Sequence, residues 1–152
     1  MAAAMELLDR ATELQVLNTT LERVLRGEGA VIALLGEAGV GKSSLAREFL
    51  DSAGSGHRVS RGFCDDLGIA EPLGVLRDLA REMMLDLPED PVEPGARLRA
   101  FSTVFEDITK SNVPTLLFVE DVHWADDATV EFLRFMTRRI SGTQIMLILT
   151  AR

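Results

Sequence analysis

An apolar run that ends in a glycine-rich turn constrains the fold of this chain more than any other feature. Val31 to Leu35 is apolar at every position, which predicts a strand covered on both faces, as in a parallel sheet. The sequence continues as Gly36-Glu-Ala-Gly-Val-Gly-Lys42-Ser43, and we expect a helix to begin at Ser43. A buried strand that passes through a short loop into a helix is the repeating unit of α/β sheets.

The turn matches the pattern G-x-x-x-x-G-K-[ST] of a P-loop, in the strand-to-helix context that this motif requires. Glycines let successive backbone N–H groups face inward, and the amino terminus of a helix favours an anion. We expect Lys42 to neutralise the outer phosphates of ATP and the Ser43 hydroxyl to coordinate Mg²⁺. The predicted ATP-binding residues are Gly36, Glu37, Ala38, Gly39, Val40, Gly41, Lys42, Ser43 and Ser44.

Two adjacent acids follow a second buried strand. Thr115 to Val119 is mainly apolar and is followed at once by Glu120 and Asp121. Magnesium prefers oxygen ligands, so one carboxylate near Ser43 can hold the ion while the other orients an attacking water. The sequence therefore predicts Glu120 and Asp121 as catalytic residues, and both of them with Ser43 as metal-site residues, without settling which acid takes which role.

The remaining pattern alternates helices with strands. Apolar residues at helical spacing predict helices over 13–25, 73–83, 98–108 and 130–140, a proline-rich acidic loop over 86–94, a weakly marked strand over 57–64 and a buried strand over 145–149. This order predicts a three-layer α/β/α sandwich around a mainly parallel sheet. We expect one domain over 1–152, with a helix and a turn in 1–29 and the sheet core in 30–152.

Composition limits the partners and the compartment. Sixteen basic against twenty-four acidic residues give a net charge of −8, which argues against direct nucleic-acid binding. The apolar runs are too short for a membrane helix, and the start of the chain lacks the basic region of a signal peptide. The single cysteine, Cys64, cannot form an internal disulfide, so we expect a cytoplasmic protein.

Three potentially reactive side chains are predicted to be structural. Cys64 has no evident basic neighbour that would activate it, so a buried thiol is expected. His123 and Trp124 belong to no triad or metal-ligand pattern and are expected to pack. Asp126 or Asp127 is expected to cap the next helix.

Four spaced motifs resemble one known family. These are the run Leu-Leu-Asp-Arg10-Ala-Thr-Glu13-Leu, the P-loop, the segment 118–126, and Leu149-Thr-Ala-Arg152. Together they resemble the nucleotide-binding domain of signal-transduction (STAND/AAA-type) P-loop ATPases, particularly large LuxR-type transcriptional regulators. The resemblance implies that Arg10 lies near the nucleotide base and that Thr150 and Arg152 sense the terminal phosphate. It assigns the magnesium role to Glu120 and the water-activating role to Asp121.

The resemblance also implies a larger protein. In that family the nucleotide-binding domain continues into another strand and a helical lid, so this chain is expected to be truncated before both. An unpaired sheet edge would then invite self-association. Hydrolysis by this chain alone is expected to be slow, because positioning groups supplied late or by a partner contribute strongly to phosphoryl transfer.

Three functions remain open from the sequence. The preferred one is an ATP-binding, slowly hydrolysing domain that acts as a nucleotide-dependent switch within a larger transcriptional regulator. The alternative is a small-molecule or nucleotide kinase built on the same P-loop, for which acceptor-binding arginines and a lid are not evident. A GTP-binding switch would require an Asn-Lys-x-Asp motif, which does not occur.

Overall fold

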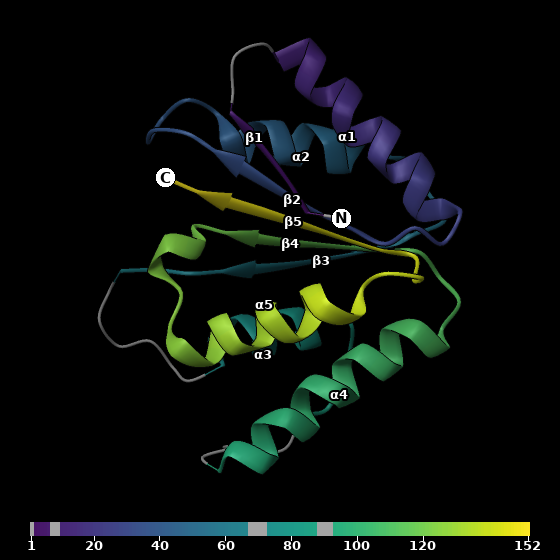
Figure 1. The fold of residues 1–152 in the computed structure, drawn as a ribbon, viewed down its shortest axis with the longest axis vertical. Helices are drawn as coiled ribbons and strands as arrows, with labels where there is room; N and C mark the ends of the chain where they lie inside the picture. Colours follow the sequence, from purple (N-terminus) through teal and green to yellow (C-terminus); the bar gives the residue numbers. More distant parts are fainter. Residues whose placement is uncertain (1, 7–9, 67–72, 88–92) are drawn as a thin grey trace.

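A single parallel sheet organises the computed structural model, which describes residues 2–6, 10–66, 73–87 and 93–152. The sheet contains β1 (Ala2–Glu6), β2 (Ala30–Leu35), β3 (Arg58–Phe63), β4 (Thr115–Glu120) and β5 (Ile145–Ala151). Their spatial order is β1-β2-β5-β4-β3, and every neighbouring pair is parallel (Figure 1). The carboxyl ends of β2 and β4 therefore lie at the same edge of the sheet, which brings the P-loop and the acids after β4 together.

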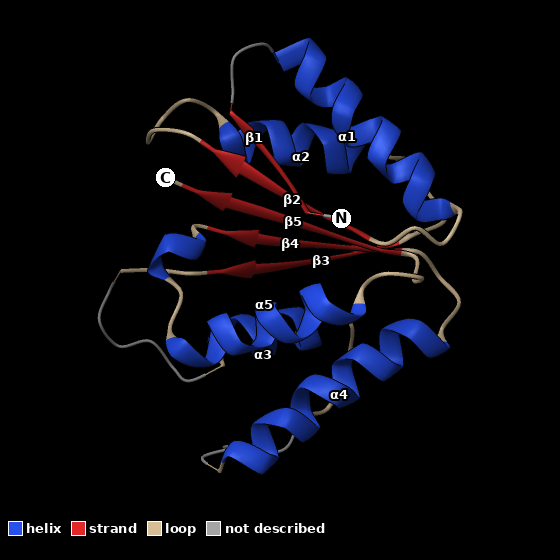
Figure 2. Cartoon of the chain, in the orientation of Figure 1, coloured by secondary structure: helices blue, strands red, loops and turns tan. Residues whose placement is uncertain are grey.

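Helices cover both faces of the sheet and make three layers, as predicted (Figure 2). One face carries α1 (Arg10–Leu25) and α2 (Lys42–Ser52); the other carries α3 (Gly74–Glu82), α4 (Pro94–Lys110) and α5 (Asp127–Arg139). A short 3₁₀ helix, η1 (Val122–Trp124), leads from β4 towards α5. The predicted α/β fold and the predicted helices and strands are thus confirmed.

Alternating side chains of the central strands divide the core into two halves. On β4, Leu116 and Phe118 belong to the core beneath α1 and α2, which also contains Phe49. Leu117 belongs to the core beneath the other three helices, with Phe132 as a large member. Because every residue of β4 is buried, this strand has no solvated face, as its continuous apolar run predicted.

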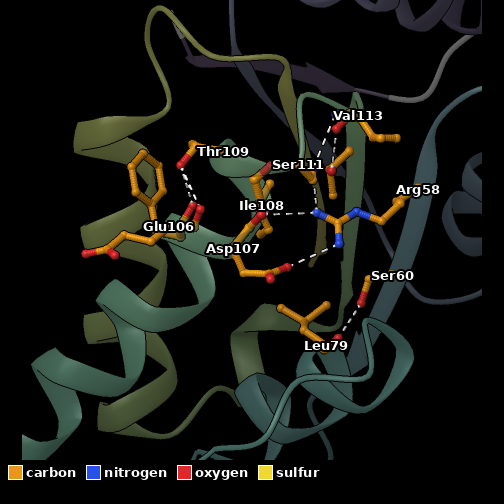
Figure 3. Close-up of polar contacts among 11 residues, drawn as sticks. Arg58, Ser60, Leu79, Glu106, Asp107, Ile108, Thr109, Ser111 and Val113 are labelled. Atoms are coloured by element: carbon orange, nitrogen blue, oxygen red, sulfur yellow. Dashed lines mark hydrogen bonds and ion pairs between the residues drawn. The ribbon is translucent and has the colours of Figure 1, made fainter.

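A glycine allows α3 to approach the sheet closely. A Cβ atom at Gly62 on β3 would lie 2.8 Å from Cγ1 of Val75 and 3.3 Å from the Val75 carbonyl oxygen. Beside this contact, the buried hydroxyl of Ser60 donates to the carbonyl oxygen of Leu79 at 2.9 Å (Figure 3). Strand β3 and helix α3 are therefore joined by close packing and by a buried hydrogen bond.

Arg58 connects the start of β3 with the end of α4 (Figure 3). Its guanidinium contacts the Asp107 carboxylate at 3.2 Å and donates to the Ser111 hydroxyl at 2.8 Å. A weaker bond at 3.5 Å reaches the Asp107 carbonyl oxygen. A cation near the carboxyl end of a helix is favourable because the unpaired carbonyl groups there carry partial negative charge.

The amino-terminal segment differs from the prediction. A helix and a turn were expected over 1–29, but Ala2–Glu6 forms β1, which pairs with β2 in the register Ala2 to Val31. The sheet therefore begins before residue 30. Alanine is depleted in strands, so the composition of this segment did not indicate one.

Helix α4 begins at Pro94, earlier than the predicted residue 98, because proline is compatible with the first turn of a helix. Part of the predicted loop over 86–94, namely residues 88–92, lies outside the described residues. Within the described ranges, no helix is long and apolar enough to span a membrane.

Candidate nucleotide-binding site

The P-loop leaves β2 and leads directly into α2. Gly39 and Gly41 have φ angles of 84° and 95°, which fall in the left-handed region that glycine adopts without strain. A Cβ atom at either position would meet nothing within 4 Å, so the backbone conformation and not a lack of space favours glycine there. The first turn of α2 contains no acidic residue, and its amino terminus has no side-chain cap within the described chain. Backbone N–H groups there can therefore bind an anion.

Lys42 is held against the loop that precedes it. The side chain is buried, with the residue 7% exposed, and its ammonium donates to the carbonyl oxygens of Gly36 at 2.5 Å and Glu37 at 2.8 Å. These contacts fix the positive charge beside the amino terminus of α2. The arrangement can stabilise a polyphosphate by combining a charge with oriented backbone donors.

Glu120 lies between two side chains of α2. The Ser43 hydroxyl donates to one carboxylate oxygen of Glu120 at 3.2 Å, and the Arg47 guanidinium contacts the other oxygen at 3.1 Å. Glu120 is 6% exposed, so its charge is offset mainly by these partners. The sequence predicted the pairing of Ser43 with an acid of β4 but did not indicate Arg47.

The donor set at Ser43 and Glu120 fits magnesium. A hydroxyl and a carboxylate oxygen are ligands that this ion accepts, and magnesium usually keeps several waters and takes further oxygens from phosphates. Among the described residues, no group of three or more His, Cys, Asp and Glu side chains could hold a metal ion. The protein would therefore supply few ligands, as at a site where a metal binds together with a nucleotide.

Asp121 follows Glu120 but has different surroundings. Its backbone is left-handed, with φ 56° and ψ 46°, and its side chain is partly exposed. The Asp121 backbone N–H donates to the hydroxyl of Thr150 at 2.9 Å, and Thr150 is completely buried. The Thr150 hydroxyl thus contacts the backbone of a candidate catalytic acid, and its expected role in sensing the terminal phosphate remains a prediction.

The two arginines assigned from the resemblance lie apart from these contacts. Arg10 forms an ion pair with Glu48 of α2 at 2.6 Å, and both side chains are about half exposed. Arg152 is exposed and forms no hydrogen bond or ion pair with any residue in the described ranges. The roles of Arg10 at the base and Arg152 at the phosphate remain predictions.

The segment after Asp121 corrects one expectation. His123 and Trp124 are exposed rather than packed in the core, with their ring centroids 5.2 Å apart and Trp124 43% exposed. Asp126 caps α5 as predicted, because its carboxylate accepts from the Thr129 backbone N–H at 2.8 Å.

The thiol of Cys64 is buried, as predicted. Burial, and after it the nearby carboxylates of Asp126 and Asp121, raise the pKa of this thiol from 9.0 to about 12. The thiol is therefore protonated at neutral pH. A protonated, buried thiol is a poor nucleophile, which agrees with a structural role.

Comparisons with known proteins agree with this geometry. The family model described as "AAA ATPase domain" matches residues 6–148. An uncharacterized protein of Rhizobium meliloti (strain 1021) is 26% identical in an alignment that covers 96% of this chain. The chain spans 18% of the length of that relative.

Proposed function

The chain belongs to the AAA ATPase domain family, whose members generally bind ATP with Mg²⁺, and from this premise we propose that it is the nucleotide switch of a larger protein. The observation that supports this function best is the contact between Ser43 and Glu120 beside the buried ammonium of Lys42. These groups come from separate elements, and together they offer charge to phosphates and oxygen ligands to a hard cation.

In this proposal each group of the site has a separate task. Lys42 and the backbone N–H groups of the P-loop bind the phosphates, and Ser43 and Glu120 would hold Mg²⁺, which would supply electrostatic stabilisation of the phosphoryl group. Asp121, which is more exposed than Glu120, orients and deprotonates the attacking water. Slow hydrolysis would then convert an ATP-bound state of the switch into an ADP-bound state.

We place this switch in a transcriptional regulator. The support is the resemblance of the four sequence motifs to the nucleotide-binding domain of LuxR-type regulators. A relative in which such a domain occupies a small part of the length is compatible with a regulated multidomain protein. The net charge of −8 favours DNA contacts by another part of such a protein.

A kinase remains the alternative function, and it would need a cavity that binds the phosphate acceptor. A cavity of about 210 Å³ at the carboxyl end of β3 is lined in part by Arg77, Arg81, Asp65, Asp78 and Asp126. Aspartates outnumber arginines there, and Arg81 already pairs with Asp78 at 3.3 Å. A negatively charged acceptor such as a nucleotide would therefore be disfavoured in this cavity.

The two lysines of the chain provide a direct test of ATP binding. Lys42→Ala removes the buried ammonium, whereas Lys110→Ala removes an exposed one that pairs with Glu106 on α4. Losing a charged hydrogen bond costs about 1.5–3 kcal/mol, so Lys42→Ala should weaken Mg-ATP binding roughly 10- to 150-fold. Calorimetry should show no change for Lys110→Ala.

Nucleotide titrations and a phosphate-transfer assay distinguish the three functions. Unchanged ATP affinity in folded Lys42→Ala would contradict the P-loop assignment. Tighter binding of GTP than ATP would favour a GTP switch. Rapid phosphate transfer to members of a panel of small hydroxyl and nucleotide acceptors, with little release to water, would favour the kinase.

A further inference from the structure

The outer side of α5 carries a concentration of positive charge that the nucleotide site does not use. Arg134, Arg138 and Arg139 are exposed on this helix, and Arg97 approaches them from α4. Four of the chain's sixteen basic residues thus gather on one side of a molecule with a net charge of −8. Helix α5 lies on the opposite face of the sheet from α2 (Figure 1).

Two of these arginines have no partner within the described chain. Arg97 pairs with Glu131 at 3.5 Å, and Arg139 lies 4.0 Å from the ring centroid of Phe135. By contrast, Arg134 and Arg138 form no ion pair or hydrogen bond with the residues that the structure describes. They are four residues apart on α5, so their side chains project from the same side, one turn apart.

Each side of this arginine pair is hollowed. Between α4 and α5 lies a hollow of about 390 Å³, to which Arg134 and Arg138 contribute together with Arg97 and the exposed Leu98. The buried Nε of Arg97 has no hydrogen-bond partner among the described residues. This hollow therefore combines arginine hydrogen-bond donors that have no partner among the described residues with apolar surface.

The second hollow, of about 320 Å³, is apolar. It is lined by Val122, Ala125, Val130 and Leu133, and again by Arg134 and Arg138 at its border. The pair of arginines thus forms a ridge between an apolar hollow and a basic one. A partner that fits this surface needs carboxylates at the ridge and an aliphatic side chain beside them.

We propose that this face of α5 is a docking surface for an acidic amphipathic helix of a partner protein. Acids one turn apart on that helix pair with Arg134 and Arg138, and an apolar residue on its adjacent face enters the hollow at Val130 and Leu133. Charge complementarity selects this occupant, because each of the two unpaired arginines can bind a carboxylate through two parallel hydrogen bonds, and the apolar hollow beside them takes an aliphatic side chain.

Other occupants fit the surface less well. A nucleic acid backbone could pair its phosphates with the arginines, but it has no aliphatic group to fill the apolar hollow at Val130 and Leu133. A second copy of this chain would supply acids, but no aliphatic residue flanked by free acids at helical spacing is evident on its described surface. Both alternatives are separable from the proposal by experiment.

The test uses a designed peptide as the probe. A fluorescein-labelled helical peptide with Glu at positions i and i+4, and Leu along the adjacent stripe, is titrated with the protein and its anisotropy is followed. We expect saturable binding that weakens as salt is raised. Arg134→Glu/Arg138→Glu should reduce the affinity about tenfold or more, because two ion pairs become repulsive contacts.

Three controls make the outcome decisive. Arg26→Glu/Arg81→Glu changes the net charge equally at exposed positions elsewhere and should leave binding unchanged. A peptide with Lys in place of both Glu should not bind, and a peptide with Ser in place of the Leu stripe should bind more weakly. Circular dichroism should confirm that both double variants are folded.

The following results would overturn the proposal. One is absence of binding, and another is equal loss of binding in the two double variants, which would indicate a general charge effect. Stronger binding of single-stranded DNA that depends on Arg134 and Arg138 would identify a nucleic-acid surface. A dimer in sedimentation that only Arg134→Glu/Arg138→Glu dissociates would identify a second copy as the occupant.

Discussion

Glu120 and Asp121 are adjacent in the sequence but occupy different chemical environments. Glu120 is buried and bonded to Ser43 and Arg47, whereas Asp121 is partly exposed and its left-handed backbone turns it away from the strand. A carboxylate anchored to the P-loop serine suits a metal ligand. A more accessible carboxylate suits a group that must take a proton from water.

This difference predicts separate phenotypes for two isosteric changes. Glu120→Gln removes a charge from the candidate metal site and should weaken Mg-dependent ATP binding about tenfold. Asp121→Asn should leave binding nearly unchanged while lowering turnover by about 10²–10⁴-fold in a protein that hydrolyses ATP. Calorimetry and single-turnover phosphate release measure the two effects, and reversed phenotypes would exchange the two roles.

Thr150 holds the position of Asp121. Thr150→Val removes the acceptor of the Asp121 backbone N–H from a buried environment, and an unsatisfied group of this kind costs about 1–3 kcal/mol. We expect urea unfolding to show a loss of that size. Thr150→Ser keeps the hydroxyl and should lose less, so equal losses in the two variants would mean that packing, not the hydrogen bond, stabilises this site.

Residues of the site differed in how far the sequence could predict them. The P-loop is contiguous, so its pattern identified Lys42 and Ser43 directly. The contacts of Arg47 and Thr150 join residues 73 and 29 positions apart. Such contacts depend on strand order and on rotation about the helix axis, which no local pattern encodes.

At the scale of elements, periodicity predicted most of the fold. Helix α1 repeats its buried residues at helical spacing, and β4 and β5 are apolar runs bounded by polar residues. Strand β1 was missed because an alanine-rich stretch favours a helix in isolation. Pairing with β2 outweighs that preference, and such a long-range contact is not evident from the segment itself.

Because α3 packs closely against β3, we expect alanine substitutions at two glycines to differ in their effect on the free energy of unfolding. Gly62→Ala would place a methyl group 2.8 Å from Val75, so the helix or the strand must shift, and overpacking of this kind costs about 1–3 kcal/mol. Gly74→Ala is the matched control, because its Cβ would meet nothing within 4 Å and it lies at the start of α3.

Chemical denaturation of the two variants measures this difference. Gly74→Ala should be neutral or stabilising by about 0.4–1 kcal/mol, since alanine reduces the freedom of the unfolded chain. An equal loss of stability in both variants would argue against a specific close contact at Gly62.

At the scale of the whole molecule, Cys64 links stability to alkaline pH. Its pKa is raised from 9.0 to about 12 on folding, first by burial and then by nearby carboxylates, so the folded state holds the thiol proton more tightly than the unfolded state. The stabilisation is complete below pH 9 and is lost as the pH rises from there towards 12.

Comparison with Cys64→Ala isolates this contribution. The free energy of unfolding of the unmodified protein should fall more steeply above about pH 9 than that of the variant, because only the former ionises a buried thiol on unfolding. Urea titrations at several pH values measure both curves. Parallel curves over this range would contradict the assigned pKa shift.

Strand β2 receives its two neighbours from distant parts of the chain, and this has a consequence for the order of folding. Ala2 pairs opposite Val31, but Ala30 pairs opposite Met146, a separation of 116 residues (146 − 30). Closing so long a loop is slow, because its entropic cost precedes the contacts that offset it. During synthesis β2 therefore cannot complete its pairing until β5 has left the ribosome, so the centre of the sheet closes late.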